Sequence, residues 1–170
     1  SGNIIPVTYD KVHLVARYKN GKQVLGEHNI DEPDEETGQH RIVDLEVFPK
    51  TRANPVAVQA IEEADLIVLG PGDFYTSILC NIVVPGIARA IRKSKGKVLY
   101  VLNLMTKFGQ SNKFKASDFL REIKKYIGKD TLDFVLVDVS SDYPKGVLER
   151  YKEEQAELVT DDLTQSKSGL

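Results

Sequence analysis

Three segments of the sequence combine glycine or serine with hydroxyl, amide or carboxylate side chains, which are residue types that bind phosphates and sugars. They are residues 70–77, 103–109 and 138–142, and each comes at the end of a short apolar run. Such runs are typical of buried parallel strands. Because ligands bind outside the carboxyl ends of the strands of an open parallel sheet, the three segments mark the predicted binding edge.

The first segment favours a phosphate or a nucleotide. Gly70 and Gly72 flank a proline, and two glycines allow the backbone to turn sharply and to lie against a ligand. Thr76 and Ser77 place hydroxyl groups where free backbone N–H groups could meet a phosphate. The tripeptide also suits a tight strand-to-helix turn without a ligand, and it matches neither a Walker loop nor the dinucleotide fingerprint.

Four further polar residues are candidates for the same site. Asp73 would repel a phosphate unless its carboxylate binds a sugar hydroxyl, a base amide or a cation, and it could equally cap the next helix or face solvent. Asn103 and Thr106 carry amide and hydroxyl groups suited to a ribose or to the edge of a uracil, although Asn103 could equally be a turn residue. Asn81 could bind the ligand or cap the following helix.

Composition and the other reactive residues exclude several classes of function. Lys and Arg total 23 against 25 Asp and Glu, so there is no excess of positive charge to bind a nucleic acid. His13, His28 and His40 show no metal-ligand spacing, and no serine lies in a nucleophile elbow. The single cysteine, Cys80, has apolar neighbours typical of a buried position. We therefore expect no catalytic residue, no metal and no cofactor.

The chain is also expected to be cytoplasmic and without membrane insertion. No apolar run approaches the roughly 18 residues that a membrane span needs. A lone cysteine cannot form an internal disulfide, which favours a reducing compartment.

The spacing of apolar residues predicts the elements that position these segments. A hairpin is predicted around Asn20-Gly21, a strong hairpin signal, and the acidic residues 31–40 are predicted to form a solvated loop. Helices are predicted to begin near Pro55, Pro85, Ser117 and Pro144, with Asn54 and Ser117 as N-caps and with Gly128 at the end of the third helix. Strands are predicted over 43–47, 66–69, 98–104 and 134–139. This alternation predicts an α/β protein: a Rossmann-like three-layer sandwich with a mostly parallel sheet, buried under helices, plus an N-terminal antiparallel β-hairpin.

Several motifs also occur in a fixed order along the chain: residues 67–79 with Asn81, Val84-Pro85-Gly86-Ile87, Asn103-Leu104-Met105-Thr106, Ala116-Ser117-Asp118, and Asn29-Ile30 after the hairpin. Through them the sequence, from about Ile4 to about Asp162, resembles the gluconeogenesis-factor family. That family is the bacterial branch of the fold that also contains 2-phospho-L-lactate transferase.

The resemblance implies a cytoplasmic, Rossmann-like protein that binds UDP-sugars such as UDP-N-acetylglucosamine and supports growth on gluconeogenic carbon and normal cell shape. No reaction is established in that branch. The positions implied for contact with the nucleotide sugar are Gly70, Gly72, Tyr75, Thr76, Ser77, Asn81, Asn103 and Thr106. Thr76 and Ser77 would hold the diphosphate, Asn103 and Thr106 the ribose or base, and Tyr75 would stack on or border the sugar.

Two other functions stay open. One is a transferase that moves a phosphate-bearing group from an activated nucleotide to an acceptor hydroxyl. It would need a metal and an acidic cluster, for which Asp73, Asp138 and Asp142 are the local candidates. The other is a scaffold that binds a protein partner and has lost its ligand.

The sequence departs from the family pattern at several places. The family usually has Ser and Leu at Asp73 and Phe74, Pro at Cys80, and Gln-Pro-Gly-Glu at residues 107–110. Neither its glycine-rich first turn nor its Arg-His-Asp segment is present. We therefore expect residues 1–162 to form the second part of the family's α/β domain, with a disordered tail over 163–170. An unpaired sheet edge in such a part would favour a homodimer.

Overall fold

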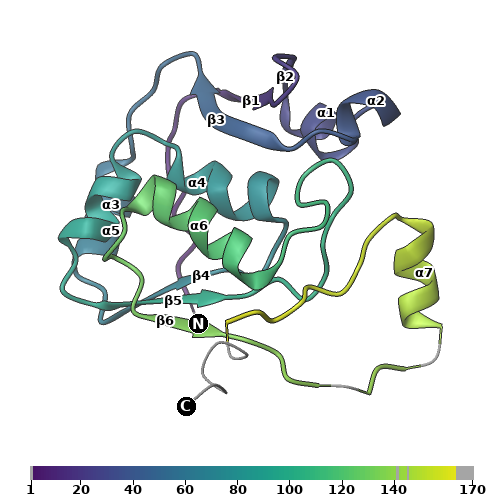
Figure 1. Cartoon of the computed structure of the whole chain (residues 1–170). Coiled ribbons are helices and arrows are strands. Elements are labelled where there is room, and N and C mark those ends of the chain that lie inside the picture. The colour runs from purple at the N-terminus through teal and green to yellow at the C-terminus, as the bar shows by residue number, and fades with distance from the viewer. Residues whose placement is uncertain (1, 141, 145, 164–170) are drawn as a thin grey trace.

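The computed structural model describes residues 2–140, 142–144 and 146–163. Figure 1 shows three layers: an antiparallel sheet, helices that include α4 and α6, and a parallel sheet. The α/β class is confirmed, with a parallel sheet and an N-terminal antiparallel hairpin. The layers have the order sheet, helices, sheet, so the helical layer lies between the two sheets.

The antiparallel sheet has the strand order β2-β1-β3, with β1 over His13–Tyr18, β2 over Gln23–Leu25 and β3 over Ile42–Phe48. The predicted Asn20-Gly21 turn joins β1 to β2, and Gly21 has a φ of 88°, which favours glycine. β3 then pairs along the other edge of β1, with Leu14 opposite Val47. The hairpin prediction is confirmed, and a third strand extends it.

The prediction of a solvated loop over residues 31–40 is wrong about the loop, although much of the segment is exposed to solvent. Two short helices occupy this region, α1 over Glu27–Asp31 and α2 over Glu35–Gly38. The Asp34 carboxylate caps α2 by accepting from the Thr37 N–H at 2.8 Å, and the Thr37 side chain is fully buried. Lys22 pairs with Asp34 at 2.7 Å, whereas Glu32, Glu35 and Glu36 remain exposed to solvent.

The parallel sheet has the order β4-β5-β6, with β4 over Leu66–Leu69, β5 over Lys97–Val101 and β6 over Phe134–Leu136. Its helices are α3 (Pro55–Glu62), the π-helical η1 (Phe74–Leu79), α4 (Cys80–Ile82), α5 (Ile87–Lys93) and α6 (Ala116–Ile127). Asn54 caps α3 and Gly128 ends α6, as the sequence predicts. Phe74 packs edge-on against Phe119 at 4.9 Å between ring centroids, which joins η1 to α6 in the core.

The two faces of the parallel sheet differ, and the prediction of a sheet buried under helices holds for one face only. Val98 and Tyr100 are buried beneath the helices. On the strands of the same sheet, Leu66, Val68 and Leu136 are 48% to 57% exposed, because no element of the described residues covers that face. Exposed apolar strands can associate with other chains, so the homodimer stays a prediction.

The C-terminal part of the described chain returns to the sheet after α7 (Val147–Glu153). Ser117 is not the N-cap of α6, since the helix already begins at Ala116. Its N–H and hydroxyl instead donate to the two carboxylate oxygens of Asp162, at 2.9 and 2.7 Å. Asp162 therefore fastens the returning segment to the start of α6. The predicted tail lies outside the described residues from 164 onward.

Among the described residues no single helix is long and apolar enough to cross a membrane. The pair Phe74–Ile82 and Ile87–Lys93 reaches that length and apolarity only when taken together, with a bend of 72°.

Candidate functional site

A cleft of about 850 Å³ lies at the carboxyl ends of β4 and β5, the edge that the sequence predicts. The segments that follow these two strands form its walls, residues 71–74 and 102–108. Asp31, with its neighbours at the end of α1, closes one side, and Tyr151 and Glu154 stand at another. Main-chain segments that are distant in sequence therefore meet at one concave site.

The glycine-rich turn after β4 is tightly packed. Gly70 has a φ of 93° and Gly72 one of 153°, and both values favour glycine. A methyl group on Gly70 would lie 3.1 Å from the Val101 carbonyl oxygen, and one on Gly72 would lie 3.0 Å from Cβ of Ser77. The glycines thus bring the loop close to β5 and η1, and the Gly72 backbone forms part of the cleft wall.

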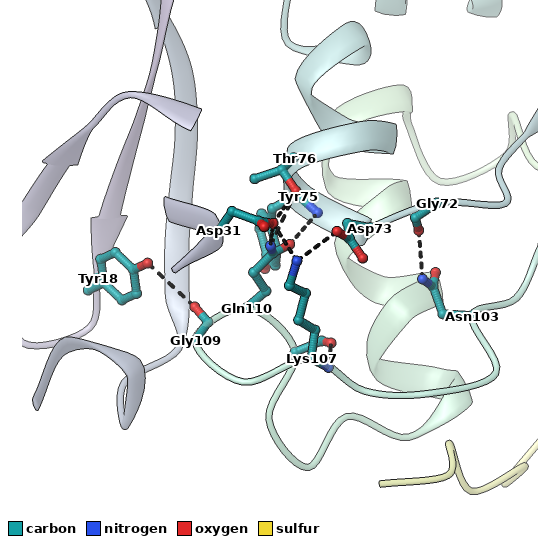
Figure 2. Close-up of polar contacts among 11 residues, drawn as sticks. Tyr18, Asp31, Gly72, Asp73, Tyr75, Thr76, Asn103, Lys107, Gly109 and Gln110 are labelled. Atoms are coloured by element: carbon teal, nitrogen blue, oxygen red, sulfur yellow. Dashed lines mark hydrogen bonds and ion pairs between the residues drawn. The ribbon is translucent and has the colours of Figure 1, made fainter. Parts of the chain in front are cut away.

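Asn103 joins this loop to the end of β5. Its amide donates to the Gly72 carbonyl oxygen at 2.7 Å (Figure 2). Its side-chain oxygen accepts from the Tyr100 hydroxyl at 2.7 Å. Asn103 is therefore a positioning residue for the loop as well as part of the cleft wall. The turn role that the sequence left open is present, and it leaves amide hydrogen-bonding capacity at the wall.

Lys107 lies between two carboxylates. Its Nζ is 2.5 Å from Oδ1 of Asp31 and 2.7 Å from Oδ2 of Asp73, as Figure 2 shows. The charge of Asp73, which the sequence alone leaves without a partner, is thus paired. Asp73 and Lys107 are both positions at which the sequence departs from the family pattern, and in the fold they contact each other.

In Asp31 and Lys107, burial and ion pairing shift the pKa values in opposite directions. Burial alone would raise the pKa of Asp31, but the hydrogen bond and charge of Lys107, with hydrogen bonds from Thr76 and Gln110, outweigh it and lower that pKa below its ordinary value. Burial alone would lower the pKa of Lys107, and the two carboxylates raise it above its ordinary value. Asp31 and Lys107 are therefore both charged near neutral pH.

Thr76 and Tyr75 lie behind the cleft wall. The Thr76 hydroxyl donates to Oδ1 of Asp31 at 3.1 Å, and the Tyr75 N–H donates to Oε1 of Gln110 at 3.1 Å. The Tyr75 ring is fully buried, and burial followed by the nearby Glu122 carboxylate raises the pKa of its hydroxyl. The proposed contact of Tyr75 with a sugar does not fit this place, because the ring fills the core between η1 and its neighbours.

The remaining predicted residues are divided between the cleft and the outer surface. Thr106 lines the cleft, but its hydroxyl accepts from the Glu157 N–H at 2.9 Å and so holds the returning C-terminal segment. Ser77 and Asn81 are exposed and do not line the cleft, and the Asn81 amide donates to the Ser77 carbonyl oxygen at 2.7 Å. The structure thus brings Gly72, Asp73, Asn103 and Thr106 to the cleft.

The third predicted segment borders a second hollow of about 450 Å³, which shares Asn103 with the cleft. Asp138 accepts there from the Ser140 N–H at 2.8 Å, and Ser141 lies outside the described residues. No group of three or more His, Cys, Asp or Glu residues is placed to hold a metal in the part of the chain that the structure describes. Burial raises the pKa of Cys80 to about 11, so this thiol is protonated at neutral pH.

Sequence reasoning missed three residues of the site: Asp31, Lys107 and Gln110. Asp31 belongs to the acidic run predicted to be solvated, and Lys107 lies in the predicted segment 103–109 without a role of its own. Gln110 stands out only as a departure from the family pattern. No local signal identifies them, since Asp31 and Lys107 are 76 positions apart in the sequence. The single cue was chemical: a carboxylate in a loop expected near a phosphate needs a cation.

Comparisons with known proteins agree on one family. The model of the family described as "2-phospho-L-lactate transferase CofD" matches residues 1–170. A Thermotoga maritima protein described as "Putative gluconeogenesis factor" is 40% identical over 158 residues, which is 93% of this chain and 48% of that protein. An Aquifex aeolicus protein with the same description is 38% identical over 163 residues, covering 95% of this chain and 49% of the relative.

A solved structure supports the same relationship. The crystal structure of a member of the UPF0052 family from Bacillus halodurans matches with a TM-score of 0.87 and 32% identity. The match covers 98% of this chain and 52% of that one. The chain thus spans about half the length of these relatives.

Proposed function

The chain belongs to the 2-phospho-L-lactate transferase CofD family, and from this premise we propose that its cleft binds a nucleotide sugar of the UDP-N-acetylglucosamine type. In this proposal the protein is a regulator that responds to this ligand and links gluconeogenic carbon use to envelope synthesis and cell shape. Because the chain spans about half the length of its relatives, the proposal concerns the intact protein as well as this part.

The observation that supports the proposal most is the place and lining of the cleft. It lies at the carboxyl ends of two parallel strands, where α/β folds bind nucleotides. Its volume of about 850 Å³ falls in the range of small-molecule sites. The apolar side chains of Leu104 and Met105 line the cleft together with the polar side chains of Asn103 and Asp73. This mixture suits a ligand with a flat base, hydroxylated rings and a diphosphate.

The residues would divide the ligand between them. Asn103 reaches the wall from the end of β5, and its amide would bind the ribose or the base. The Gly72 backbone would lie along the ligand, because no side chain at this position keeps it away. Thr76 and Gln110, which lie behind the cleft wall, would hold Asp31 and the start of η1 in place through their hydrogen bonds. Tyr75 has only a packing role.

Calorimetric titration of the chain with UDP-N-acetylglucosamine, with UDP-glucose and GDP as comparators, tests the proposal. We expect saturable binding that prefers uridine nucleotides. Asn103→Ala should weaken it about fivefold or more, because one wall amide is lost. Asn81→Ala removes an exposed amide outside the cleft and is the matched control, which should bind normally. Absence of uridine-selective binding, or equal effects of the two variants, would contradict the proposal.

A transferase is the second candidate, and the description of the matching family model favours it. Such an enzyme would break the phosphoanhydride bond of an activated nucleotide and join the phosphate-bearing group to an acceptor hydroxyl, releasing a nucleoside monophosphate. Incubating the chain with a nucleoside-diphosphate-linked donor, Mg²⁺ and a hydroxylated acceptor, and measuring the monophosphate, separates the two. Release that depends on the acceptor would establish the transferase over the regulator.

A further inference from the structure

The charges that line the cleft are unbalanced. Among the described residues that line it, Lys107 is the only cationic side chain, whereas four carboxylates line it, those of Asp31, Glu32, Asp73 and Glu154. A diphosphate entering this cleft would be repelled more than attracted. A phosphate-bearing ligand can therefore bind only if a carboxylate of the cleft loses its charge or if Lys107 exchanges one of its carboxylate partners for the phosphate.

The two carboxylates on Lys107 are held in different ways. Oδ1 of Asp31 accepts from Lys107, from Nε2 of Gln110 at 2.9 Å and from the Thr76 hydroxyl at 3.1 Å, and its side chain is 24% exposed. Figure 2 shows these donors gathered on Asp31. Moving Asp31 away would leave partly buried donors without a partner, which is costly. Asp31 is therefore the fixed anion of the group.

Asp73 is the weakly held anion. Among the described residues, Lys107 is the only partner that its carboxylate contacts, and the side chain is 45% exposed. It lies directly after Gly72, at the N-terminal end of η1, on the cleft wall. Rotation of this side chain into solvent breaks one partly exposed ion pair, with side chains 33% and 45% exposed, while Lys107 keeps its contact with Asp31. Ion pairs that solvent reaches contribute little to stability.

We propose that a phosphate of the ligand replaces the Asp73 carboxylate on Lys107 while Asp31 stays in place. This inference rests on the proposed function, because it assigns the phosphate position in the same cleft. After the exchange, Lys107 still has two anionic partners, so the ammonium group is not left unpaired. Asp73 then acts as a specificity residue. Its carboxylate competes with the ligand for Lys107, so only a ligand with a strongly anionic group such as a phosphate displaces it.

The test compares Asp73→Asn, Lys107→Met and Asp133→Asn by calorimetry, with UDP-N-acetylglucosamine, UDP and uridine as the probes. Asp133→Asn is the matched control, because it neutralises an aspartate paired with a lysine at the same 2.7 Å outside the cleft. Asp73→Asn should bind UDP and the UDP-sugar about 3- to 30-fold more tightly, because the competing charge is gone. Lys107→Met should bind both at least about tenfold more weakly. Uridine, which has no phosphate, should bind all variants alike.

The outcomes separate the two proposals. If the wild-type chain binds the UDP-sugar and Asp73→Asn binds it equally or more weakly, the exchange is wrong and the proposed function stands. If neither protein binds any probe, both proposals are wrong. If Lys107→Met fails to fold by circular dichroism, Lys107→Gln takes its place, and unchanged UDP affinity in that variant would overturn the exchange.

Discussion

Both ends of the parallel sheet carry a lysine–aspartate pair with the same 2.7 Å between Nζ and a carboxylate oxygen. At the amino end, Lys97 is the first residue of β5 and pairs with Asp133, which directly precedes β6. At the carboxyl end, Lys107 pairs with Asp73 and with Asp31. The first pair joins two neighbouring strands. The second joins α1, the loop after β4 and the loop after β5.

The difference shows that one kind of contact can have two roles. The Lys97 side chain is 63% exposed, and its ion pair is screened by solvent. The Lys107 side chain is 33% exposed and lies on the wall of a cleft. We infer that the amino end depends on its backbone packing, whereas the carboxyl end depends on its charges. Three substitutions test this contrast.

The largest loss of stability is expected from Gly96→Ala at the amino end. Gly96 directly precedes β5, and a methyl group there would overlap the Ala64 carbonyl oxygen and lie 2.9 Å from the backbone of Asp65. These backbone atoms hold the connection into β4, because the Lys97 N–H donates to the Asp65 carbonyl oxygen at 2.9 Å. We expect the free energy of unfolding to fall by about 2–4 kcal/mol, measured by urea denaturation.

Gly146→Ala is the matched control for this change. Gly146 precedes the exposed helix α7, and a methyl group there would meet nothing within 4 Å. Its φ of 87° makes alanine unfavourable by about 1 kcal/mol. Equal losses for the two variants would show that backbone packing at the amino end is not special.

The second test removes the fixed anion at the carboxyl end. Asp31→Asn weakens three hydrogen bonds to one oxygen, so we expect a loss of about 1–2 kcal/mol at pH 7 in urea denaturation. The pKa of Asp31 is lowered in the folded chain, so its carboxylate contributes stability above the unfolded pKa of about 4 and loses this contribution as the pH falls through the folded value. The wild type and the variant should therefore converge in stability below about pH 4.

The amino end provides the control for this acid titration. The hydrogen bond from Lys97, with another from the Val98 N–H, lowers the pKa of Asp133 as well. However, the Lys97 side chain is 63% exposed, against 33% for Lys107, so solvent screens its charge more strongly. Asp133→Asn should therefore change the pH dependence less than Asp31→Asn does. A difference between Asp31→Asn and the wild type that persists undiminished at low pH would show that the contribution of Asp31 is not its charge.

Much of the fold was predictable from local patterns. The Asn20-Gly21 turn, the cap at Asn54 and the stop at Gly128 each depend on a few neighbouring residues, and the structure confirms all three. The apolar runs of the parallel strands were also correct as elements. The exposure of Leu66 and Val68 could not be predicted. Burial on each face of a sheet depends on which elements pack there, and the sequence of the strand does not encode this.

The site was predictable only in its position. The rule on strand ends placed Gly72 and Asn103 at the cleft, since it depends on topology alone. The contact of Lys107 with Asp31 could not be predicted, because Asp31 reaches the cleft through the packing of α1 against β1 and η1, which is a long-range outcome. Tyr75 has a hydroxyl group suited to a sugar, but its ring is buried in the core. This orientation depends on the elements that pack against η1, which the local sequence does not specify.

The smallest effect is expected from Lys97→Met, and it tests the contrast most directly. Methionine keeps the length and apolar stem of the lysine, so the change removes the charge of an exposed pair and little else. We expect the melting temperature to stay within about 2 °C of the wild type in 150 mM salt, and the affinity for UDP-N-acetylglucosamine to be unchanged. The same change at Lys107 leaves Asp31 partly buried without its cation and removes the proposed partner of the phosphate. If Lys97→Met lowered stability as much as Lys107→Met does, the two ion pairs would be equivalent, and burial on the cleft wall could not be what distinguishes them.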